Sequence, residues 1–250
     1  MKLVSVYRDT FLNLSNDSYN KCNSAYAKGG PEQAIQMLNM NLDMNITDYV
    51  TVGFKGLVDV IDALGGIDID VDESEISHLN NYQICIAEDL KRDYTPVKST
   101  GLQHLNGLQA TAYCRIRYTK GDDFMRAQRQ REVLQALADK AKQADTATLT
   151  KTAASILDAG AVSTSLDVDE ILEVLGELSK YSIVASDGFP FEDSRTTGTL
   201  GSWGSCVVPL SLESNVMKLH AFLFEDANYQ ASPEVKEYSQ QIKSKTSKYL

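Results

Sequence analysis

The sequence predicts an α/β fold. Short runs in which apolar and polar residues alternate are typical of strands. Along the chain these runs alternate with segments whose apolar residues recur every three or four positions, as in helices. Glycine pairs separate several of these segments. With 250 residues, 43% of them hydrophobic, the chain can bury a substantial core and is most simply one domain, with residues 231–250 as an appendage.

The N-terminal part predicts a strand followed by a helix. Residues 3–6 have strand composition. Gly29 and Gly30 form a turn that places Pro31 at the first position of a helix, which we expect to end near Leu42. The expected inner face of this helix consists of Ala34, Ile35, Leu38 and Leu42.

Residues 49–71 continue the pattern into a β-α-β-α-β rhythm. A strand is expected at 49–54, and a helix follows that ends at Gly65 and Gly66. Its apolar positions are Leu57, Val58, Ile61 and Leu64. The next segment alternates strictly, as a half-buried edge strand does, with Ile67, Ile69 and Val71 on one side and aspartates on the other.

The segment at 72–105 is polar and irregular, which favours a surface excursion with one strand at 82–86. Residues 101–112 then lead through the start of a helix. Later segments are assigned by the same periodicities: helices at 144–159, 168–178 and 215–224, strands at 181–185 and from Val207, and a loop at 187–204. The stretch from Pro233 is expected to be a surface helix or a frayed tail.

Basic side chains are concentrated within seventeen positions in the middle of the chain. Apolar residues from Asp123 to Ala141 recur as in an amphipathic helix, with Asp122 or Asp123 as its N-cap. Arg126, then Arg129 or Gln130, would project from its first two turns, where unpaired N–H groups and the positive end of the helix dipole also bind anions. We call the following residues the arginine cluster: Arg115, Arg117, Lys120, Arg126, Arg129 and Arg131.

A single charge at a helix start is most simply explained as solvated surface. Two acids do not neutralise the six bases of the cluster, however, so an anion is needed to offset their repulsion. Arginine pairs bidentately with phosphate oxygens and stays protonated. The cluster therefore predicts a phosphate-binding pocket.

The overall charge excludes other classes of function. A net charge of −10 and a pI near 4.8 disfavour nucleic-acid binding, because most of the surface would repel the phosphate backbone. The sequence contains no apolar stretch of the length that spans a bilayer, no signal peptide and no glycine-rich nucleotide loop. We expect the chain as given to be soluble and unanchored.

The four cysteines show no metal-ligand spacing with the three histidines, which argues against zinc. Cys114 lies in an apolar run and is expected to be a core residue. Cys85 and Cys206 could form a disulfide if the protein is exported.

Four ordered blocks resemble the LytR-CpsA-Psr family. They are the strand ending in Arg8-Asp9, the Lys-x-Asn-x-Ala-Tyr-x-x-Gly-Gly segment at 21–30, the Leu-Gly-Gly-Ile block within 58–71, and the Arg-x-Arg and Asp-Phe-x-Arg-x-x-Arg-Gln motif at 115–130. Residues 198–208 and 215–224 are also similar to the C-terminal part of many members. The resemblance implies a three-layer α-β-α fold with a central mixed sheet, in which residues 1–230 form the catalytic domain without its first strands.

The resemblance also implies an activity: transfer of a glycopolymer, such as a teichoic acid or capsular polysaccharide, from a polyprenyl-pyrophosphate carrier to peptidoglycan. Asp123, Arg117 and Arg126 would be catalytic, with Asp123 orienting an arginine or taking part in proton transfer. Arg129 would support the residues that hold the pyrophosphate, which are Arg8, Arg115, Arg117, Arg126 and Gln130. Phosphoryl transfer by positioning and charge neutralisation agrees with such an arginine cage.

Members of the family carry a membrane helix and acidic metal-binding strands before the Arg-Asp strand, and this chain starts at that strand. We therefore expect an N-terminally truncated protein of the extracellular face of the cytoplasmic membrane. Mg²⁺ or a similar cation would be held mostly by residues upstream of Met1. Asp9 could still reach a metal through water, although such a residue more commonly caps a turn. The lipid tail is expected in a groove between the sheet, the helix at 34–42 and the long helix.

The alternative function is a non-catalytic envelope protein that binds polyprenyl phosphate or an anionic glycopolymer through the same arginines. A transcription regulator is disfavoured, because no helix-turn-helix with a basic recognition face is visible in the sequence. The transferase and the binding-protein hypotheses both depend on Arg8 converging with the cluster arginines on one diphosphate.

Overall fold

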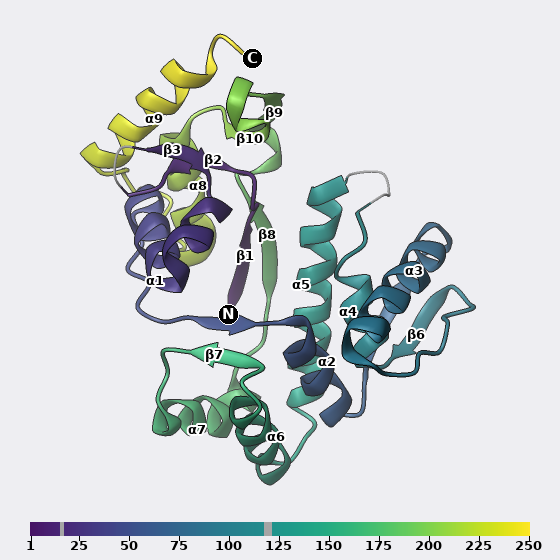
Figure 1. The fold of residues 1–250 in the computed structure, drawn as a ribbon. Helices are drawn as coiled ribbons and strands as arrows, with labels where there is room; N and C mark the ends of the chain where they lie inside the picture. The colour runs from purple at the N-terminus through teal and green to yellow at the C-terminus, as the bar shows by residue number, and fades with distance from the viewer. Residues whose placement is uncertain (16–17, 118–121) are drawn as a thin grey trace. The chain divides into compact units, whose positions relative to one another are not determined.

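The structure, a computed structural model, describes residues 1–15, 18–117 and 122–250 (Figure 1). The chain folds into two compact units. The first unit comprises Met1 and Val50–Ala185, and the second comprises Lys2–Tyr49 and Ser186–Leu250. Each unit has its own hydrophobic core. The predicted α/β class is confirmed, and the strands of the described residues form five two-stranded sheets.

The first unit is built mainly of helices. Its elements are β4 (Val50–Val52), α2 (Phe54–Ala63), β5 (Ile67–Val71), α3 (Glu73–Leu90), β6 (Gly101–Leu105), α4 (Gly107–Tyr113), α5 (Asp122–Ala141), α6 (Thr146–Asp158), β7 (Val162–Thr164) and α7 (Val168–Glu177). The helices predicted before Gly65, after Asp122, and at 144–159 and 168–178 are thus confirmed.

The strand β5 shows the predicted alternation. Ile67, Ile69 and Val71 are buried, and the intervening aspartates are exposed. β5 pairs antiparallel with β6, and the buried side chains join the core that α3, α4 and α5 cover. Figure 1 shows α3 and α4 lying side by side next to β6.

The prediction of an irregular segment at 72–105 was wrong, because residues 73–90 form the long helix α3. A capping box starts this helix: the Asp72 side chain accepts from the Ser74 N–H, and the Glu75 side chain accepts from the Asp72 N–H. Leu79 and Ile86 then bury its apolar stripe. The Asp-x-x-Glu spacing signals a helix start, and polar residues on the other side of the helix concealed it.

A glycine pair ends α2 and contacts a histidine of the neighbouring strand. Gly65 and Gly66 have φ of 79° and 90°, which favours glycine. A Cβ on Gly66 would lie 2.6 Å from His104 Nε2. His104 Nδ1 lies 2.7 Å from the Asp68 carboxylate, and Nε2 lies 2.7 Å from the Gly65 carbonyl oxygen. Both partners are acceptors, so both contacts are hydrogen bonds only in the protonated imidazolium.

This arrangement predicts a pH-dependent stability. The hydrogen bond to Asp68, followed by the one to Gly65, raises the pKa of His104 above its ordinary value of 6.5. Stabilisation is therefore complete below pH 6.5 and is lost as the pH rises through the raised folded-state pKa. The imidazole is more than half exposed, so we expect a loss of at most about 1 kcal/mol.

The measurement is urea unfolding of the protein and of His104→Gln at about pH 5.5 and about pH 9. The difference in unfolding free energy between the two proteins should shrink at the higher pH. A difference that is independent of pH would contradict the protonated arrangement.

The second unit contains the N-terminal residues from Lys2 onward and the C-terminus. Its elements are β1 (Lys2–Val6), β2 (Phe11–Asn13), β3 (Tyr19–Lys21), α1 (Asn23–Leu42), β8 (Ala185–Phe189), β9 (Arg195–Thr199), β10 (Ser205–Pro209), α8 (Leu212–Phe224) and α9 (Pro233–Thr246). The predicted N-terminal strand, the strand from Val207 and the helix at 215–224 are confirmed.

The helix α1 is interrupted where the sequence predicted a turn. Gly29 and Gly30 have non-helical backbone angles, and Gly30 has a φ of 67°. Pro31 begins the second part, as predicted. The helical residues before Gly29 were missed, because this stretch lacks an apolar repeat.

The C-terminal segment belongs to the second unit rather than forming an appendage. α9 starts with Ser232 as N-cap, whose hydroxyl accepts from the Val235 N–H, and with Pro233 in the first turn. Val235 and Ile242 are buried in the core shared with α1 and α8. Figure 1 shows α9 next to α1. The boundary predicted at residue 230 is therefore not seen, although the helical interpretation of this segment holds.

The region at 181–204 differs from the prediction. The strand starts at Ala185 instead of residue 181, and the polar segment expected to be a loop contains β9. β9 is rich in threonine, a strand former, and pairs antiparallel with β10, whose Cys206, Val207 and Val208 are buried. Tertiary pairing thus outweighs the loop-like composition.

Candidate functional site

The Arg115–Arg117 segment emerges directly from α4. A capping box formed by Asn106 and Gln109 starts this helix, and every residue of it is buried. The Arg115 N–H then donates to Ala112 O at 3.0 Å. Ile116 is fully buried and anchors the segment between the two arginines, whose side chains reach partial exposure. The looped conformation predicted here is confirmed.

The helix α5 spans Asp122–Ala141, and the prediction of Asp122 or Asp123 as its N-cap stays a prediction. The preceding positions, 118–121 with Lys120, lie outside the described residues. Gln130 is exposed, whereas Arg129 and Val133 are buried, so the predicted stripe of α5 faces the interior of the first unit.

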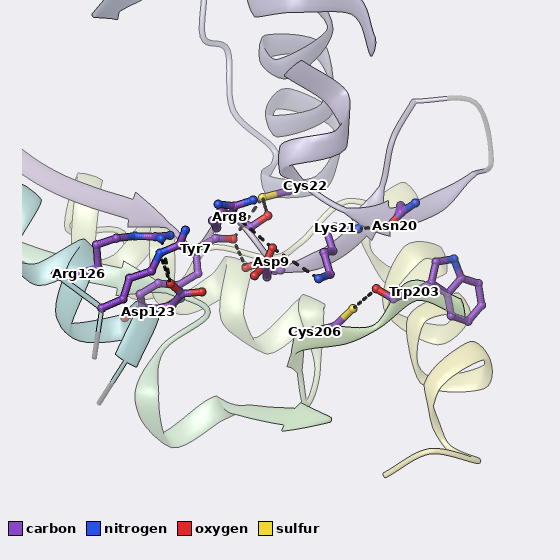
Figure 2. A network of polar contacts seen from close by, with 12 residues as sticks. Tyr7, Arg8, Asp9, Asn20, Lys21, Cys22, Asp123, Arg126, Trp203 and Cys206 are labelled. Carbon is purple, nitrogen blue, oxygen red and sulfur yellow. Dashed lines mark hydrogen bonds and ion pairs between the residues drawn. The ribbon is translucent and has the colours of Figure 1, made fainter. Parts of the chain in front are cut away.

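Asp123 contacts two arginines of the cluster. Its Oδ1 atom lies 3.0 Å from Arg126 Nη1 and 3.5 Å from Arg117 Nε. Figure 2 shows Arg126 against Asp123, one turn further along the helix. The side chain of Arg126 is 12% exposed, and that of Arg117 is 39% exposed. One carboxylate therefore holds two guanidinium groups, as an orienting residue would.

Arg129 is a buried support. Its side chain is 2% exposed, and its Nε donates to Glu75 Oε1 at 2.6 Å. Its Nη1 donates to the carbonyl oxygen of Ile116 at 3.1 Å. Because these contacts lie in the interior, Arg129 does not fit a direct contact with pyrophosphate. It fixes the backbone between Arg115 and Arg117, which corresponds to the supporting part of its predicted role.

Arg131 and Arg115 differ from the arginines above in their surroundings. The Nε and Nη1 atoms of Arg131 are buried and have no hydrogen-bond partner among the described residues. Arg115 has no ion pair within those residues. Its guanidinium carbon lies 4.6 Å from the ring centroid of Phe54 and 5.2 Å from that of Tyr82.

The Arg-Asp strand end lies in the second unit. Asp9 contacts Arg8 Nε at 3.5 Å and Lys21 Nζ at 3.8 Å, and Figure 2 shows it between these two side chains. The Arg8 side chain is about half exposed. Since Arg8 belongs to one unit and the cluster to the other, their convergence on one diphosphate stays a prediction.

The surroundings of Asp9 do not match a Mg²⁺ site. Mg²⁺ prefers several oxygen ligands, and the neighbours of Asp9 are two bases. The part of the chain that the structure describes has no group of three or more His, Cys, Asp or Glu side chains that could hold a metal.

The cysteines are all free thiols. Cys85, exposed on α3, and Cys206, buried in β10, are both free, so the disulfide that the sequence left open is not formed. Burial raises the pKa of Cys22 and of Cys114 to about 12, and it also raises the pKa of Cys206. These three thiols are therefore protonated and unreactive near neutral pH.

A cavity of about 360 Å³ lies in the first unit, and no residue of the arginine cluster lines it. Its charged residues are paired with one another: Arg92 with Asp59 and Asp62, and Lys55 with Asp59. The hydrogen bonds to Lys55 and Arg92 lower the pKa of Asp59 against the effect of burial. This cavity therefore has little charge left for an anionic ligand.

Comparison with known proteins identifies the family. The sequence model of the LytR_cpsA_psr family matches residues 1–202. The chain belongs to the LytR-CpsA-Psr family. This confirms the resemblance that the four sequence blocks indicated.

Two curated members illustrate the similarity. The chain is 40% identical over 150 residues to the polyisoprenyl-teichoic acid–peptidoglycan teichoic acid transferase TagV of Bacillus subtilis, covering 58% of this chain and 36% of TagV. It is 29% identical over 234 residues to the regulatory protein MsrR of Staphylococcus aureus, covering 90% of this chain and 65% of MsrR. The chain thus spans less than two thirds of the length of these relatives.

Several solved structures share the fold. The B. subtilis TagV structure superposes with a TM-score of 0.68 at 30% identity, over 92% of this chain and 85% of TagV. A protein described as a transcriptional regulator from Enterococcus faecalis gives 0.73 at 25% identity, over 99% and 85%. TagT bound to LI-WTA gives 0.62 at 19% identity, over 97% and 77%, and shows the fold alone. Among the described residues of the present chain, no helix has the length and hydrophobicity to cross a bilayer.

Proposed function

We propose that this protein is a phosphotransferase that moves a glycopolymer, of the teichoic acid or capsular polysaccharide type, from a polyprenyl-pyrophosphate carrier to peptidoglycan. The observation that carries this proposal is the gathering of guanidinium groups from the Arg115–Arg117 segment and from α5 around one carboxylate. Asp123 Oδ1 lies within ion-pair distance of both Arg117 and Arg126, and Arg115 has no ion pair among the described residues. The naming of the relative TagV as a teichoic acid transferase supports the same activity.

The proposed reaction exchanges one phosphorus–oxygen bond for another. A hydroxyl of the peptidoglycan acceptor attacks the phosphorus that carries the sugar, and the bond from this phosphorus to the bridging oxygen breaks. Polyprenyl monophosphate leaves with the bonding electron pair, the hydroxyl proton passes to a base or to solvent, and the glycopolymer remains attached through a phosphodiester.

The arginines would act by positioning the pyrophosphate and neutralising charge that develops on it. Arg117 and Arg126, already oriented by Asp123, would contact the phosphate oxygens, and Gln130 and Arg8 would complete the pocket. Two guanidinium groups lie within ion-pair distance of Asp123 Oδ1, and this arrangement supports an orienting role for the carboxylate.

The described residues do not form a Mg²⁺ site around Asp9, so no step of the proposed reaction is assigned to a metal ion. A requirement for Mg²⁺ or a similar cation remains part of the proposal, with ligands supplied from elsewhere than these residues. The proposed partners are the lipid-linked glycopolymer and peptidoglycan, and the proposed location is the outer face of the cytoplasmic membrane.

The test is a transfer assay with purified protein, a polyprenyl-pyrophosphate-linked saccharide carrying a labelled sugar, and peptidoglycan. We expect label on the peptidoglycan and release of polyprenyl monophosphate in Mg²⁺, and less of both with a chelator. Binding of the lipid pyrophosphate without release of monophosphate, with or without added Mg²⁺, would instead support a non-catalytic binding protein.

A further inference from the structure

Arg115 is held by two aromatic rings rather than by a carboxylate. The 4.6 and 5.2 Å distances from its guanidinium carbon to the Phe54 and Tyr82 centroids are within cation–π range, about 6 Å. No hydrogen bond or ion pair to the Arg115 side chain occurs within residues 1–15, 18–117 and 122–250. The rings therefore take the place that Asp123 has for Arg126 and that Glu75 has for Arg129.

The position of Phe54 is fixed by the start of α2. Gly53 is the N-cap, and Gly56 packs so closely on the segment between α6 and β7 that a Cβ there would lie 2.4 Å from the Ala161 carbonyl oxygen. The Phe54 side chain is nevertheless 52% exposed. Burial in the core therefore does not explain a phenylalanine at this position, whereas contact with Arg115 does.

Tyr82 reaches Arg115 from a different element. It lies on α3 and packs partly against the core of the first unit, so the core supports its ring. The backbone of Arg115 is fixed in turn by the buried Ile116 and its hydrogen bond from Arg129. Three separate elements thus determine where this guanidinium lies.

The chemical consequence follows from the geometry of guanidinium. Its N–H donors lie in the plane of the group, and aromatic rings stack on its faces. A carboxylate partner would occupy donors and cancel the charge, whereas ring faces leave both available to an anion. Arg115 is therefore ordered in advance without being neutralised.

We propose that Phe54 and Tyr82 form an aromatic bracket that positions Arg115 to bind the pyrophosphate of the lipid carrier. This inference rests on the proposed function. Phe54 and Tyr82 are positioning residues in it, because they act through Arg115 and not by contact with the reacting atoms.

The test measures the affinity for geranyl pyrophosphate and the kinetics of transfer in Phe54→Leu and Tyr82→Leu. Leucine keeps an apolar side chain and removes the ring. Each substitution should weaken binding by about 2–5-fold, through KM more than kcat, because an exposed cation–π contact is a modest interaction. Tyr82→Phe keeps the ring face and should bind like the unmodified protein.

A double-mutant cycle separates positioning from a general structural effect. In an Arg115→Ala background, Phe54→Leu should cause no further loss of affinity, since its effect passes through the missing arginine. Full additivity of the two substitutions would overturn the proposal, and so would unchanged affinity in both leucine variants. Circular dichroism and thermal unfolding confirm that each variant is folded.

The result for the unmodified protein distinguishes failure of the proposed function from failure of the aromatic bracket. If it neither binds geranyl pyrophosphate nor transfers label, the proposed function fails and the bracket fails with it. If it binds and Arg115→Ala weakens binding, but the cycle shows no coupling, only the bracket is refuted.

Discussion

Replacing Arg126 with alanine is expected to reduce kcat/KM for glycopolymer transfer by roughly 100-fold. A hydrogen bond to a charged group contributes about 1.5–3 kcal/mol, and each 1.4 kcal/mol or so is a factor of ten. The substitution also leaves Asp123 with Arg117 as its only ion-pair partner among the described residues, so the remaining guanidinium loses part of its orientation. The labelled-sugar transfer assay measures the change.

The matched control is Lys180→Ala, which removes an exposed basic side chain of the first unit that forms a surface ion pair with Glu177. It should leave transfer unchanged, which rules out an effect of net charge alone. Arg126→Lys keeps the charge without the planar fork and should recover only part of the activity. Loss of the folded state in Arg126→Ala, or full activity in this variant, would contradict the assigned role.

Replacing Arg129 with alanine is expected to destabilise the first unit by about 3–5 kcal/mol, a loss large enough to unfold many domains. The substitution leaves Glu75, only 8% exposed, as a buried charge without its partner. It also removes the hydrogen bond to Ile116 O, which fixes the segment between Arg115 and Arg117. Activity should fall together with stability, unlike in Arg126→Ala.

Two probes locate this loss. The single tryptophan, Trp203, lies in the second unit, so its fluorescence reports that unit, and circular dichroism reports both. Urea should shift the dichroism transition of Arg129→Ala more than the fluorescence transition. Adding Glu75→Gln removes the uncompensated charge, keeps an acceptor for the Asp72 N–H and should restore part of the stability. Equal shifts in both probes, or no gain from Glu75→Gln, would contradict the buried-pair explanation.

Local periodicity predicted the elements whose two sides differ in polarity. Ile67, Ile69 and Val71 alternate with aspartates, and β5 has the expected buried and exposed faces. Gly30 and Pro31 marked the interruption of α1 correctly. The same criterion failed for α3, where polar residues outnumber the apolar stripe, and for β9, whose threonines are ordered by pairing with β10.

In the candidate site, too, local sequence predicted some features, and others depend on tertiary contacts. Sequence motifs indicated which basic residues belong together, and they assigned a supporting role to Arg129. They gave no sign of Glu75, because its place beside Arg129 depends on α3 packing against the Arg115–Arg117 segment. Phe54 and Tyr82 were missed for the same reason, since each comes from a helix far from Arg115 in the sequence.

The sequence by itself determined the family, the α/β class and the presence of more arginine charge in one segment than its own acids can balance. These properties follow from residue types and spacings within short stretches of chain. Only the tertiary structure decided which arginines remain available to an anion. Arg129 is buried and paired with Glu75, and Asp123 is shared by Arg117 and Arg126. Arg115 instead contacts aromatic ring faces, which do not neutralise its charge. The availability of a guanidinium group to an anion depends on the partners that distant segments bring to it.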